Sequence, residues 1–423
     1  MKRVVKVGFF FVALCLLLVV LPSFRFALGH SVSVSNEAPH IGEGGLPQFE
    51  LVQGWPKVPS KWRMGAGSDI AADSQGNIWI LSRPRTLAHP PTGSPDLAST
   101  PAPPVMEFDN DGNFIQGWGG TSGPGYQWPS NEHGITIDDK GFVWITGNAD
   151  GGMNNPAHLP NDNEILKFTK DGKFVLAIGK SGQTGSNATD VLKGATGVRY
   201  YAKRDELFVS DGYGNNRIIV FDASTGKMKR MWGAYGNTPI DHDKRIPAAK
   251  FQPNETCPVV CGIWETFQQF ELPHDVLISS DDLVYVSDRG NKRVQVFTVD
   301  GKFIAEQFFG LDSKEYLQAR SVSFSPDERF LYVAGSPITY IVNRHTLEIL
   351  GSFVTGPKQE HTPGHKITTD KFGNIYITKA DVTGADVAHN GGTGAYKFAF
   401  KGYAPRTPCC QSTRAADTSG MKQ

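Results

Sequence analysis

Net charge, cysteine and long apolar runs are all scarce in this chain, and each scarcity excludes a class of protein. The 423 residues include 42 basic and 42 acidic side chains, so the formal net charge is zero. Proteins that bind nucleic acid or anionic membranes electrostatically carry an excess of positive charge. The sequence therefore gives no reason to expect a nucleic-acid partner.

Cysteine occurs five times, and Cys15 lies in an N-terminal apolar run. The others are Cys257 and Cys261 in one segment and Cys409 and Cys410 in another. A thiolate zinc site needs more cysteines close together than either segment has. Since an exported chain can form disulfides, we interpret Cys257 and Cys261 as a local disulfide and leave the pairing of Cys409 and Cys410 open.

The long apolar run spans 7–21, follows a basic N-terminus and precedes small residues at 27–29. This pattern is typical of a secretory signal, so residues 1–29 are interpreted as a signal peptide and the protein as periplasmic or extracellular. An uncleaved membrane anchor is the alternative, because Arg25 and Phe26 interrupt the cleavage region. Membrane attachment is expected only in that case.

Glycine (47) and proline (27) are abundant and separate many short runs of Val, Ile, Phe and Tyr. Such a composition is typical of an all-β chain with tight turns. A four-strand unit recurs along the chain, at 68–120, 133–180, 196–233, 274–310, 321–353 and 365–403.

The last unit lacks its outermost strand, and FELVQGW at 49–55 resembles the outer strands FIQGWGG and MKRMWG. Pairing this N-terminal strand with the last unit would close the ring and remove its exposed edges. We therefore predict one six-bladed β-propeller over 47–403, with 30–46 as a linker and 404–423 as a disordered tail.

Three histidines occupy one position of this repeat. They begin the runs HGITI (His133), HDVLI (His274) and HKITT (His365). Aligning the six inner strands gives a single column of residues: Ser68, His133, Thr196, His274, Arg320 and His365.

Alternate blades of a six-fold ring are related by about 120°, so the three imidazoles are expected to converge on the axis. This predicts a three-histidine metal site with an open position for water or substrate. Zinc suits three neutral imidazoles, although the same ligands hold iron, copper or nickel. The alternative is that each histidine only caps a strand or bonds a neighbouring turn.

Residues that end the second strand of a blade are expected to point into the same mouth. They are Arg83, Tyr213 and Arg289. Arginine binds carboxylates bidentately, and a tyrosine beside cations can act as a base. Alternatively, Tyr213 packs a turn and Arg289 pairs with Asp288. The long segments 81–104, 146–164, 181–193 and 234–272 are predicted to surround this mouth.

The repeat resembles the NHL family, most closely in VSDGYGNNRIIVF (209–221) and VSDRGNKRVQVF (286–297). With the three histidines and the Ser-Asp-Gly-Tyr motif, the chain further resembles the peptidyl-α-hydroxyglycine α-amidating lyases. These secreted six-bladed propellers cleave a C-terminal α-hydroxyglycine to a peptide amide and glyoxylate.

The resemblance implies that His133, His274 and His365 hold zinc, that Tyr213 is the base, and that the arginines Arg83 and Arg289 bind or polarise the substrate. An aspartate that follows the family's third histidine helps to hold a structural calcium ion. Lys366 stands at that position here. Because a lysine cannot hold calcium, the resemblance does not carry calcium over to this chain.

These observations lead us to expect an exported, monomeric, metal-dependent C–N lyase whose substrate is a small molecule or a peptide C-terminus. Two other interpretations stay open: a propeller enzyme with another substrate, and a non-catalytic propeller that binds peptide or protein. A lactonase-type hydrolase would need carboxylate ligands on the axis, and the aligned column offers none.

Overall fold

The computed structural model describes most of the repeat region, and within it the chain is all-β. The described residues are 45–88, 100–149, 162–183, 185–241, 268–310, 318–335, 337–355, 364–380 and 394–404. The predicted signal peptide, the linker up to 44, the tail from 405 and all five cysteines lie outside them, as do parts of the long segments predicted around the mouth. Within the described ranges, no helix has the length and apolar character needed to cross a membrane.

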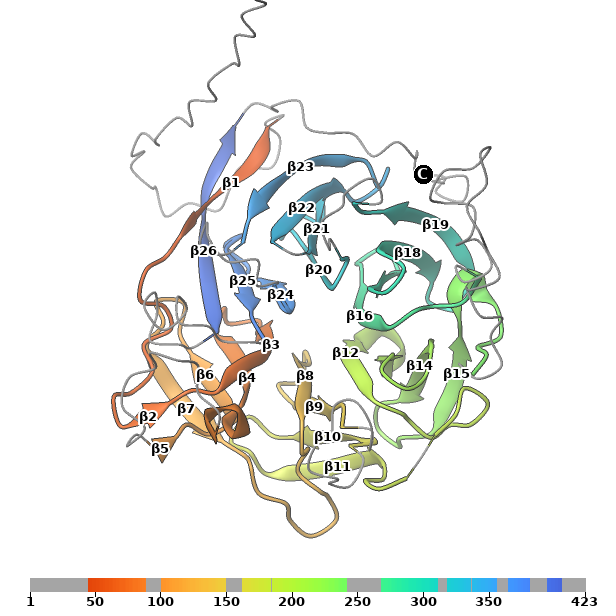
Figure 1. Cartoon of the computed structure of the whole chain (residues 1–423), viewed down its shortest axis with the longest axis horizontal. Coiled ribbons are helices and arrows are strands. Elements are labelled where there is room, and N and C mark those ends of the chain that lie inside the picture. Colours follow the sequence, from red (N-terminus) through yellow and green to blue (C-terminus); the bar gives the residue numbers. More distant parts are fainter. Residues whose placement is uncertain are drawn as a thin grey trace, which may run out of the picture. The chain divides into compact units, whose positions relative to one another are not determined.

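Six four-stranded antiparallel sheets follow one another around a central axis, which confirms the predicted six-bladed propeller (Figure 1). Blades 1 to 3 contain β3 (Ala66–Ala72), β4 (Ile78–Arg83), β6 (Val105–Phe108) and β7 (Phe114–Trp118); β8 (Glu132–Ile137), β9 (Val143–Gly147), β10 (Glu164–Phe168) and β11 (Phe174–Gly179); and β12 (Ala195–Tyr201), β13 (Glu206–Asp211), β14 (Arg217–Asp222) and β15 (Met228–Trp232).

The second half of the ring repeats this order. Blades 4 to 6 contain β16 (Pro273–Ile278), β17 (Leu283–Asp288), β18 (Arg293–Thr298) and β19 (Phe303–Phe308); β20 (Ser321–Phe324), β21 (Phe330–Ala334), β22 (Ile338–Asn343) and β23 (Ile349–Val354); and β24 (Lys366–Thr369), β25 (Ile375–Thr378), β26 (Ala395–Ala404) and β1 (Leu46–Leu51). Among the described residues, the remaining elements are a two-stranded parallel pair and three short 3-10 helices: β2 (Trp62–Arg63), β5 (Thr100–Pro101), η1 (Pro84–Ala88), η2 (Ala202–Arg204) and η3 (Ala234–Gly236).

The N-terminal strand completes the last blade, as the sequence predicts. β1 pairs antiparallel with β26 and is the outermost strand of blade 6 (Figure 1). The strand ends at Leu51, earlier than the predicted run 49–55. Gly54 adopts a positive φ of 70°, and Trp55 turns inward to pack against Phe108 and Tyr376. The chain therefore leaves blade 6 within this run and enters the interface with blade 1.

Short turns join the first two strands of a blade, and a repeated aspartate builds several of them. Asp73, Asp138 and Asp370 each accept two backbone N–H groups of their own turn. The second carboxylate oxygen accepts a hydrogen bond from an aromatic side chain two positions into the next strand, Trp79 in blade 1 and Trp144 in blade 2. One carboxylate thus fixes both the turn and the packing of the strand that follows it.

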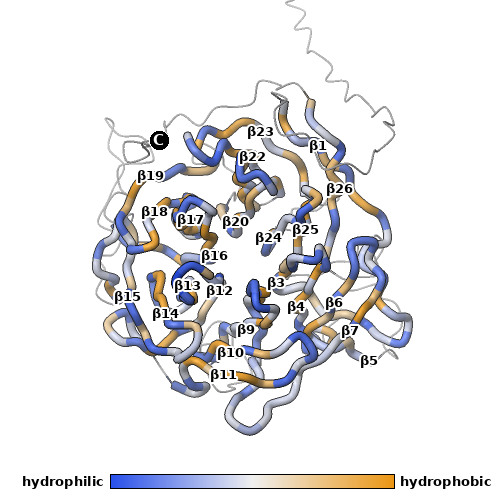
Figure 2. The backbone as a smooth tube through the Cα atoms, turned by 180° about the vertical axis from the view of Figure 1, so that it is seen from behind, coloured by the Kyte–Doolittle hydropathy of each residue, from blue (hydrophilic) through white to orange (hydrophobic). Residues whose placement is uncertain are grey.

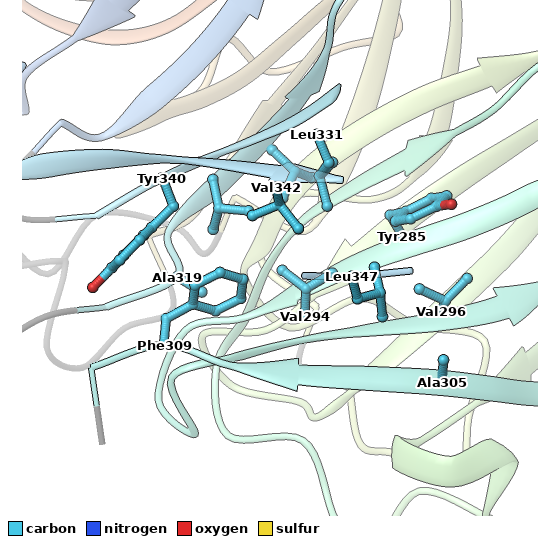
Figure 3. Packing of buried hydrophobic residues seen from close by; sticks show 12 residues of the cluster. Tyr285, Val294, Val296, Ala305, Phe309, Ala319, Leu331, Tyr340, Val342 and Leu347 are labelled. Atoms are coloured by element: carbon cyan, nitrogen blue, oxygen red, sulfur yellow. The ribbon is translucent and has the colours of Figure 1, made fainter. Parts of the chain in front are cut away.

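The hydrophobic core is divided among the blade interfaces. Six clusters of buried apolar side chains occur, and each joins two neighbouring blades. Figure 3 shows the cluster between blades 4 and 5, where Tyr285 and Val294 face Leu331 and Val342. In Figure 2 the apolar stretches recur within the strands of every blade. Because each interface is dry and closely packed, the inner strands are held at fixed angles around the axis.

The Asp…Arg spacing of the NHL pattern has a structural role in this chain. Arg217 bonds Asp211 at 3.1 Å in blade 3, and Arg293 bonds Asp288 at 2.8 Å in blade 4. All four side chains are fully buried, so each ion pair ties the end of a second strand to the start of the third.

Candidate metal centre

The structure brings the three predicted histidines together on the ring axis. The ring centroids of His133 and His274 are 5.0 Å apart, and His365 lies 4.9 Å from each. The three rings therefore form a nearly equilateral triangle. One ligand atom from each histidine lies within 4.8 Å of the others, and all three side chains are buried. Side chains separated by more than ninety positions in sequence thus make one compact cluster.

A β-bulge turns the column residue toward the axis in the first four blades. The register between the first two strands shifts between Glu132 and Gly134 and between Pro273 and Asp275. The unpaired residues are His133 and His274, and the bulges of blades 1 and 3 fall at the equivalent positions. A bulge inserts one extra residue and re-aims its side chain. His133 and His274 therefore point inward because of the backbone irregularity that carries them, whereas His365 directly precedes β24.

Each imidazole is oriented by a backbone carbonyl of the next blade in the column. The Nδ1 atoms lie 2.7 Å from the oxygen of Thr196 for His133, 2.8 Å from that of Arg320 for His274, and 2.6 Å from that of Ser68 for His365. A carbonyl oxygen can only accept, so Nδ1 carries the proton and Nε2 keeps its lone pair. Metal-binding histidines show this outer contact, and the donor set therefore fits a transition-metal ion.

Burial lowers the pKa of all three histidines well below the ordinary value. Nearby positive charge adds to this effect: Lys366 lowers the pKa of each histidine, Arg83 acts on His133 and His365, and Arg289 acts on His274. Desolvation and neighbouring cations both disfavour the imidazolium form. The rings are therefore neutral near pH 7, the state in which imidazole binds a metal.

Tyr213 lies against the histidine cluster. Its hydroxyl is 3.3 Å from Nε2 of His133 and 3.5 Å from Nε2 of His274. The residue follows β13, and its backbone N–H donates to the carbonyl of Gly194. Gly194 has a φ of 81°, and a Cβ there would lie 2.8 Å from Cβ of Tyr213. From the sequence, Tyr213 could have been a residue that only packs this turn. In the structure the turn presents the phenol to the metal-binding atoms.

The two predicted arginines border the cluster from different blades. Arg83 ends β4, and its Nε donates to the carbonyl of Glu132 at 2.8 Å. Arg289 follows β17, and its Nε donates to Oε1 of Gln318 at 2.9 Å. The alternative pairing of Arg289 with Asp288 is wrong, because the carboxylate of Asp288 accepts from Arg293, Asn291 and the N–H of Glu271.

Sequence reasoning gave no role to Arg320 or Gln318. Arg320 stands in the aligned column, and its Nε donates at 2.7 Å to Oε1 of Gln318, the atom that also accepts from Arg289. The column position was the available signal for Arg320. Gln318 precedes the strand by three residues, in a segment without a recognisable repeat pattern.

A layer of buried charge lies directly beside the histidines. Nζ of Lys366 donates to the carbonyl of His274 at 2.6 Å and lies 3.5 Å from Oδ1 of Asp275. Nη2 of Arg199 lies 3.5 Å from the same oxygen. Gly197 provides the space, because a Cβ there would lie 3.0 Å from Oδ1 of Asp275 and 3.2 Å from Nζ of Lys366. This ammonium therefore ties blade 6 to the backbone of the histidine strand in blade 4.

Replacement of Lys366 by methionine is expected to lower the free energy of unfolding by about 3–5 kcal/mol, because Asp275 would lose a buried partner. Urea unfolding followed by tryptophan fluorescence measures the effect. The matched control is Lys371→Met, since Lys371 is exposed and its Nζ makes a long contact of 3.5 Å to the carbonyl of Ser74 and lies over the ring of Phe372. Equal urea midpoints for the two variants would show that the buried ammonium contributes no net stability.

Residues 270–297 match the model of the NHL repeat family. This segment covers the histidine strand of blade 4, Arg289 and the buried pair of Asp288 and Arg293. Fold and site together define the class: the chain is a six-bladed β-propeller with one segment, 270–297, that matches the NHL repeat, and with a buried histidine triad that could bind a metal.

Within that class, the sequence relatives include amidating lyases. The chain is 25% identical over 298 residues to NHL repeat-containing protein 3 of Mus musculus, covering 68% of this chain and 67% of that protein. It is 30% identical over 168 residues to the probable peptidyl-alpha-hydroxyglycine alpha-amidating lyase pgal-1 of Caenorhabditis elegans, covering 39% and 36%. It is 31% identical over 259 residues to peptidyl-alpha-hydroxyglycine alpha-amidating lyase 2 of Drosophila melanogaster, covering 59% and 51%.

Proposed function

We propose that this chain is an exported, metal-dependent lyase that cleaves the C–N bond of a peptidyl-α-hydroxyglycine to a peptide amide and glyoxylate. The observation that carries the proposal is the position of Tyr213, whose hydroxyl lies 3.3 and 3.5 Å from the Nε2 atoms of two clustered histidines. Metal ligands and a base candidate thus share one site. Similarity to two amidating lyases supports the same chemistry.

His133, His274 and His365 would hold the metal, with zinc as the ion that best suits three neutral imidazoles. When bound, such an ion acts as a Lewis acid toward a substrate oxygen. Calcium does not form part of the proposal, because the ammonium of Lys366 fills the space beside the histidine layer.

The protein's own side chains supply the remaining steps. Tyr213 takes the proton of the substrate hydroxyl as the carbon–oxygen double bond forms. The C–N bond breaks, its electron pair goes to the amide nitrogen, and a proton is returned there. Arg83 and Arg289 neutralise the carboxylate that leaves as glyoxylate. We further propose that the enzyme acts as a monomer outside the cytoplasm, on a small molecule or a peptide C-terminus.

The zinc-loaded protein is expected to release equimolar glyoxylate and amide from an N-acylated α-hydroxyglycine, because Tyr213 and the arginines act on the hydroxyl and carboxylate of that group. Mass spectrometry of both products measures this. The control substrate is the matching N-acylglycine, which lacks the hydroxyl and should remain intact. Bound metal without glyoxylate release would contradict the lyase and leave a metal-binding propeller with another substrate. Absence of metal would favour a non-catalytic binding propeller.

A further inference from the structure

The odd-numbered blades separate the three blades that carry the histidines, and their inner strands β3, β12 and β20 alternate with β8, β16 and β24 around the axis (Figure 1). The column residues of the odd-numbered blades are Ser68, Thr196 and Arg320. As described above, the carbonyl of each accepts the Nδ1 proton of the histidine in the preceding blade. These blades also make contacts in the other direction, toward the blade that carries the next histidine.

The hydroxyl of Ser68 reaches forward to blade 2. Its Oγ lies 2.8 Å from the carbonyl oxygen of Glu132 and 3.1 Å from that of His133. A carbonyl oxygen only accepts, so the hydroxyl donates its single proton to this pair of carbonyls. The carbonyl of Glu132 belongs to the peptide bond that leads into His133, at the β-bulge. Ser68 therefore holds the ring of His365 with its carbonyl and the backbone at His133 with its hydroxyl.

Thr196 repeats this arrangement between blades 2 and 4. Its Oγ1 lies 2.7 Å from the carbonyl oxygen of Pro273 and 2.8 Å from both the carbonyl oxygen and the hydroxyl of Ser210. The carbonyl of Pro273 leads into His274, again at a β-bulge. Thr196 therefore holds the ring of His133 and the backbone at His274. In two separate blades, a column hydroxyl thus bonds the carbonyl that precedes a histidine.

In blade 5 the residue next to the column position, Ser321, makes the corresponding contacts. Its Oγ accepts the backbone N–H of Ile367 in blade 6 at 3.1 Å and donates to the carboxylate of Asp275 in blade 4. Ser68, Thr196 and Ser321 are all fully buried, so water does not compete for these bonds. Together with the three Nδ1 contacts, the hydroxyl bonds form a closed series around the axis through all six blades.

We infer that Ser68 and Thr196 are positioning residues of the metal centre, and that their hydroxyls couple the three histidines into one preorganised set. The inference rests on the metal site of the proposed function and not on its lyase chemistry. The hydroxyl fixes the bulge from which one histidine projects, and the carbonyl of the same residue fixes the ring of another. Ligands that are already held in place lose less freedom when a metal binds, so these bonds raise the metal affinity.

The zinc affinity of the whole protein, measured by competition with a chelator, tests the inference. Thr196→Val replaces the hydroxyl with a methyl group and keeps the backbone carbonyl. It is expected to weaken zinc binding by about 10- to 100-fold, the usual cost of losing an outer contact of a metal ligand. Ser68→Ala should lie near the lower figure, because Nε of Arg83 also donates to the carbonyl of Glu132. Thr196→Ser restores a hydroxyl and should recover the affinity that Thr196→Val loses.

Ser323→Ala is the matched control. Ser323 is buried in β20, and its Oγ bonds Oγ1 of Thr369 across blades 5 and 6 at 3.0 Å. The variant removes a buried hydroxyl bond between blades without removing a bond to a histidine or to the carbonyl before it. Its zinc affinity should equal that of the wild type, and thermal unfolding of the metal-free proteins shows which variants fold. An equal loss of zinc affinity in Ser323→Ala would overturn the inference, because general loosening of the ring would then account for the effect.

The double variant that combines Ser68→Ala with Thr196→Val tests the coupling itself. In a coupled set the first change already releases the neighbouring histidines, so the combined fold-loss should be smaller than the product of the two single losses. A combined loss equal to that product would show that the two hydroxyls act independently and would overturn the coupling. Wild-type zinc affinity in either single variant that folds, or the absence of zinc binding by the wild type, would overturn the inference as a whole.

These outcomes are separate from those of the proposed reaction. Zinc affinity that depends on the two hydroxyls, without glyoxylate release by the zinc-loaded wild type, would support the positioning role and reject the lyase. Glyoxylate release by a wild type whose zinc affinity is unaffected by Ser68→Ala and Thr196→Val would do the reverse.

Discussion

Replacement of His133 by alanine is expected to abolish both metal binding and glyoxylate release. The wild-type protein should carry about one transition-metal ion per chain. Loss of an outer partner of a metal-binding histidine already costs about 10- to 100-fold in affinity, and loss of the ligand itself removes a coordinate bond. Two histidines would remain, and among the described residues the cluster contains no further His, Cys, Asp or Glu to replace the lost ligand.

The measurement is metal content by plasma mass spectrometry after dialysis, together with product release. His345→Ala is the matched control, because His345 is exposed in the turn between β22 and β23 and does not belong to the cluster. Circular dichroism should show that both variants keep the β-sheet fold. Retention of a full equivalent of metal by His133→Ala would contradict a site built on the three histidines.

The fold could be predicted because its repeat consists of patterns between residues close in sequence. Alternating apolar residues and short turns recur in every unit, and each blade needs only its neighbours to bury its faces. The closing strand was predictable for the same reason, since the last unit lacked one strand and the run at 49–55 resembled an outer strand. Its end was placed too late, because Trp55 contacts blade 1 and that contact has no local signal.

The histidine cluster was predictable from the column alone, but its supporting contacts were not. The carbonyl that orients His133 belongs to Thr196, and the carbonyl that orients His365 belongs to Ser68, almost three hundred residues away. Such contacts depend on which blade follows which and on a β-bulge that a single sequence does not reveal. Strand alignment therefore yields the ligands, whereas the outer contacts need the assembled ring.

The buried charges escaped prediction for a different reason. Lys366 was noted only because it cannot hold calcium, yet its ammonium bonds the carbonyl of His274 from another blade. Gln318 joins Arg289 and Arg320 across two blades. In each case the residue type is ordinary for a loop or strand end, and only the three-dimensional neighbours give it a role. A sequence column cannot show a partner that lies outside the column.

Tyr213→Phe is expected to lower kcat for glyoxylate release by about 10²- to 10⁴-fold, the usual contribution of a positioned base. The phenol hydroxyl is the group that lies against the Nε2 atoms of His133 and His274, and phenylalanine removes only that hydroxyl. The bonds that orient the two rings run from Nδ1 to the backbone and do not involve the phenol. Metal content should therefore remain at the wild-type level while turnover falls.

The separation of these two readouts is what distinguishes a base from a structural tyrosine. A tyrosine that only supports the histidines would lower metal affinity and catalysis together when its hydroxyl is removed. A base would lower kcat with little change in KM, because the proton moves in the transition state and not in the bound ground state. Tyr126→Phe serves as the control, since that hydroxyl bonds the carbonyl of Thr121 in the connection between blades 1 and 2. Unchanged kcat in Tyr213→Phe would contradict the assignment of the base to Tyr213.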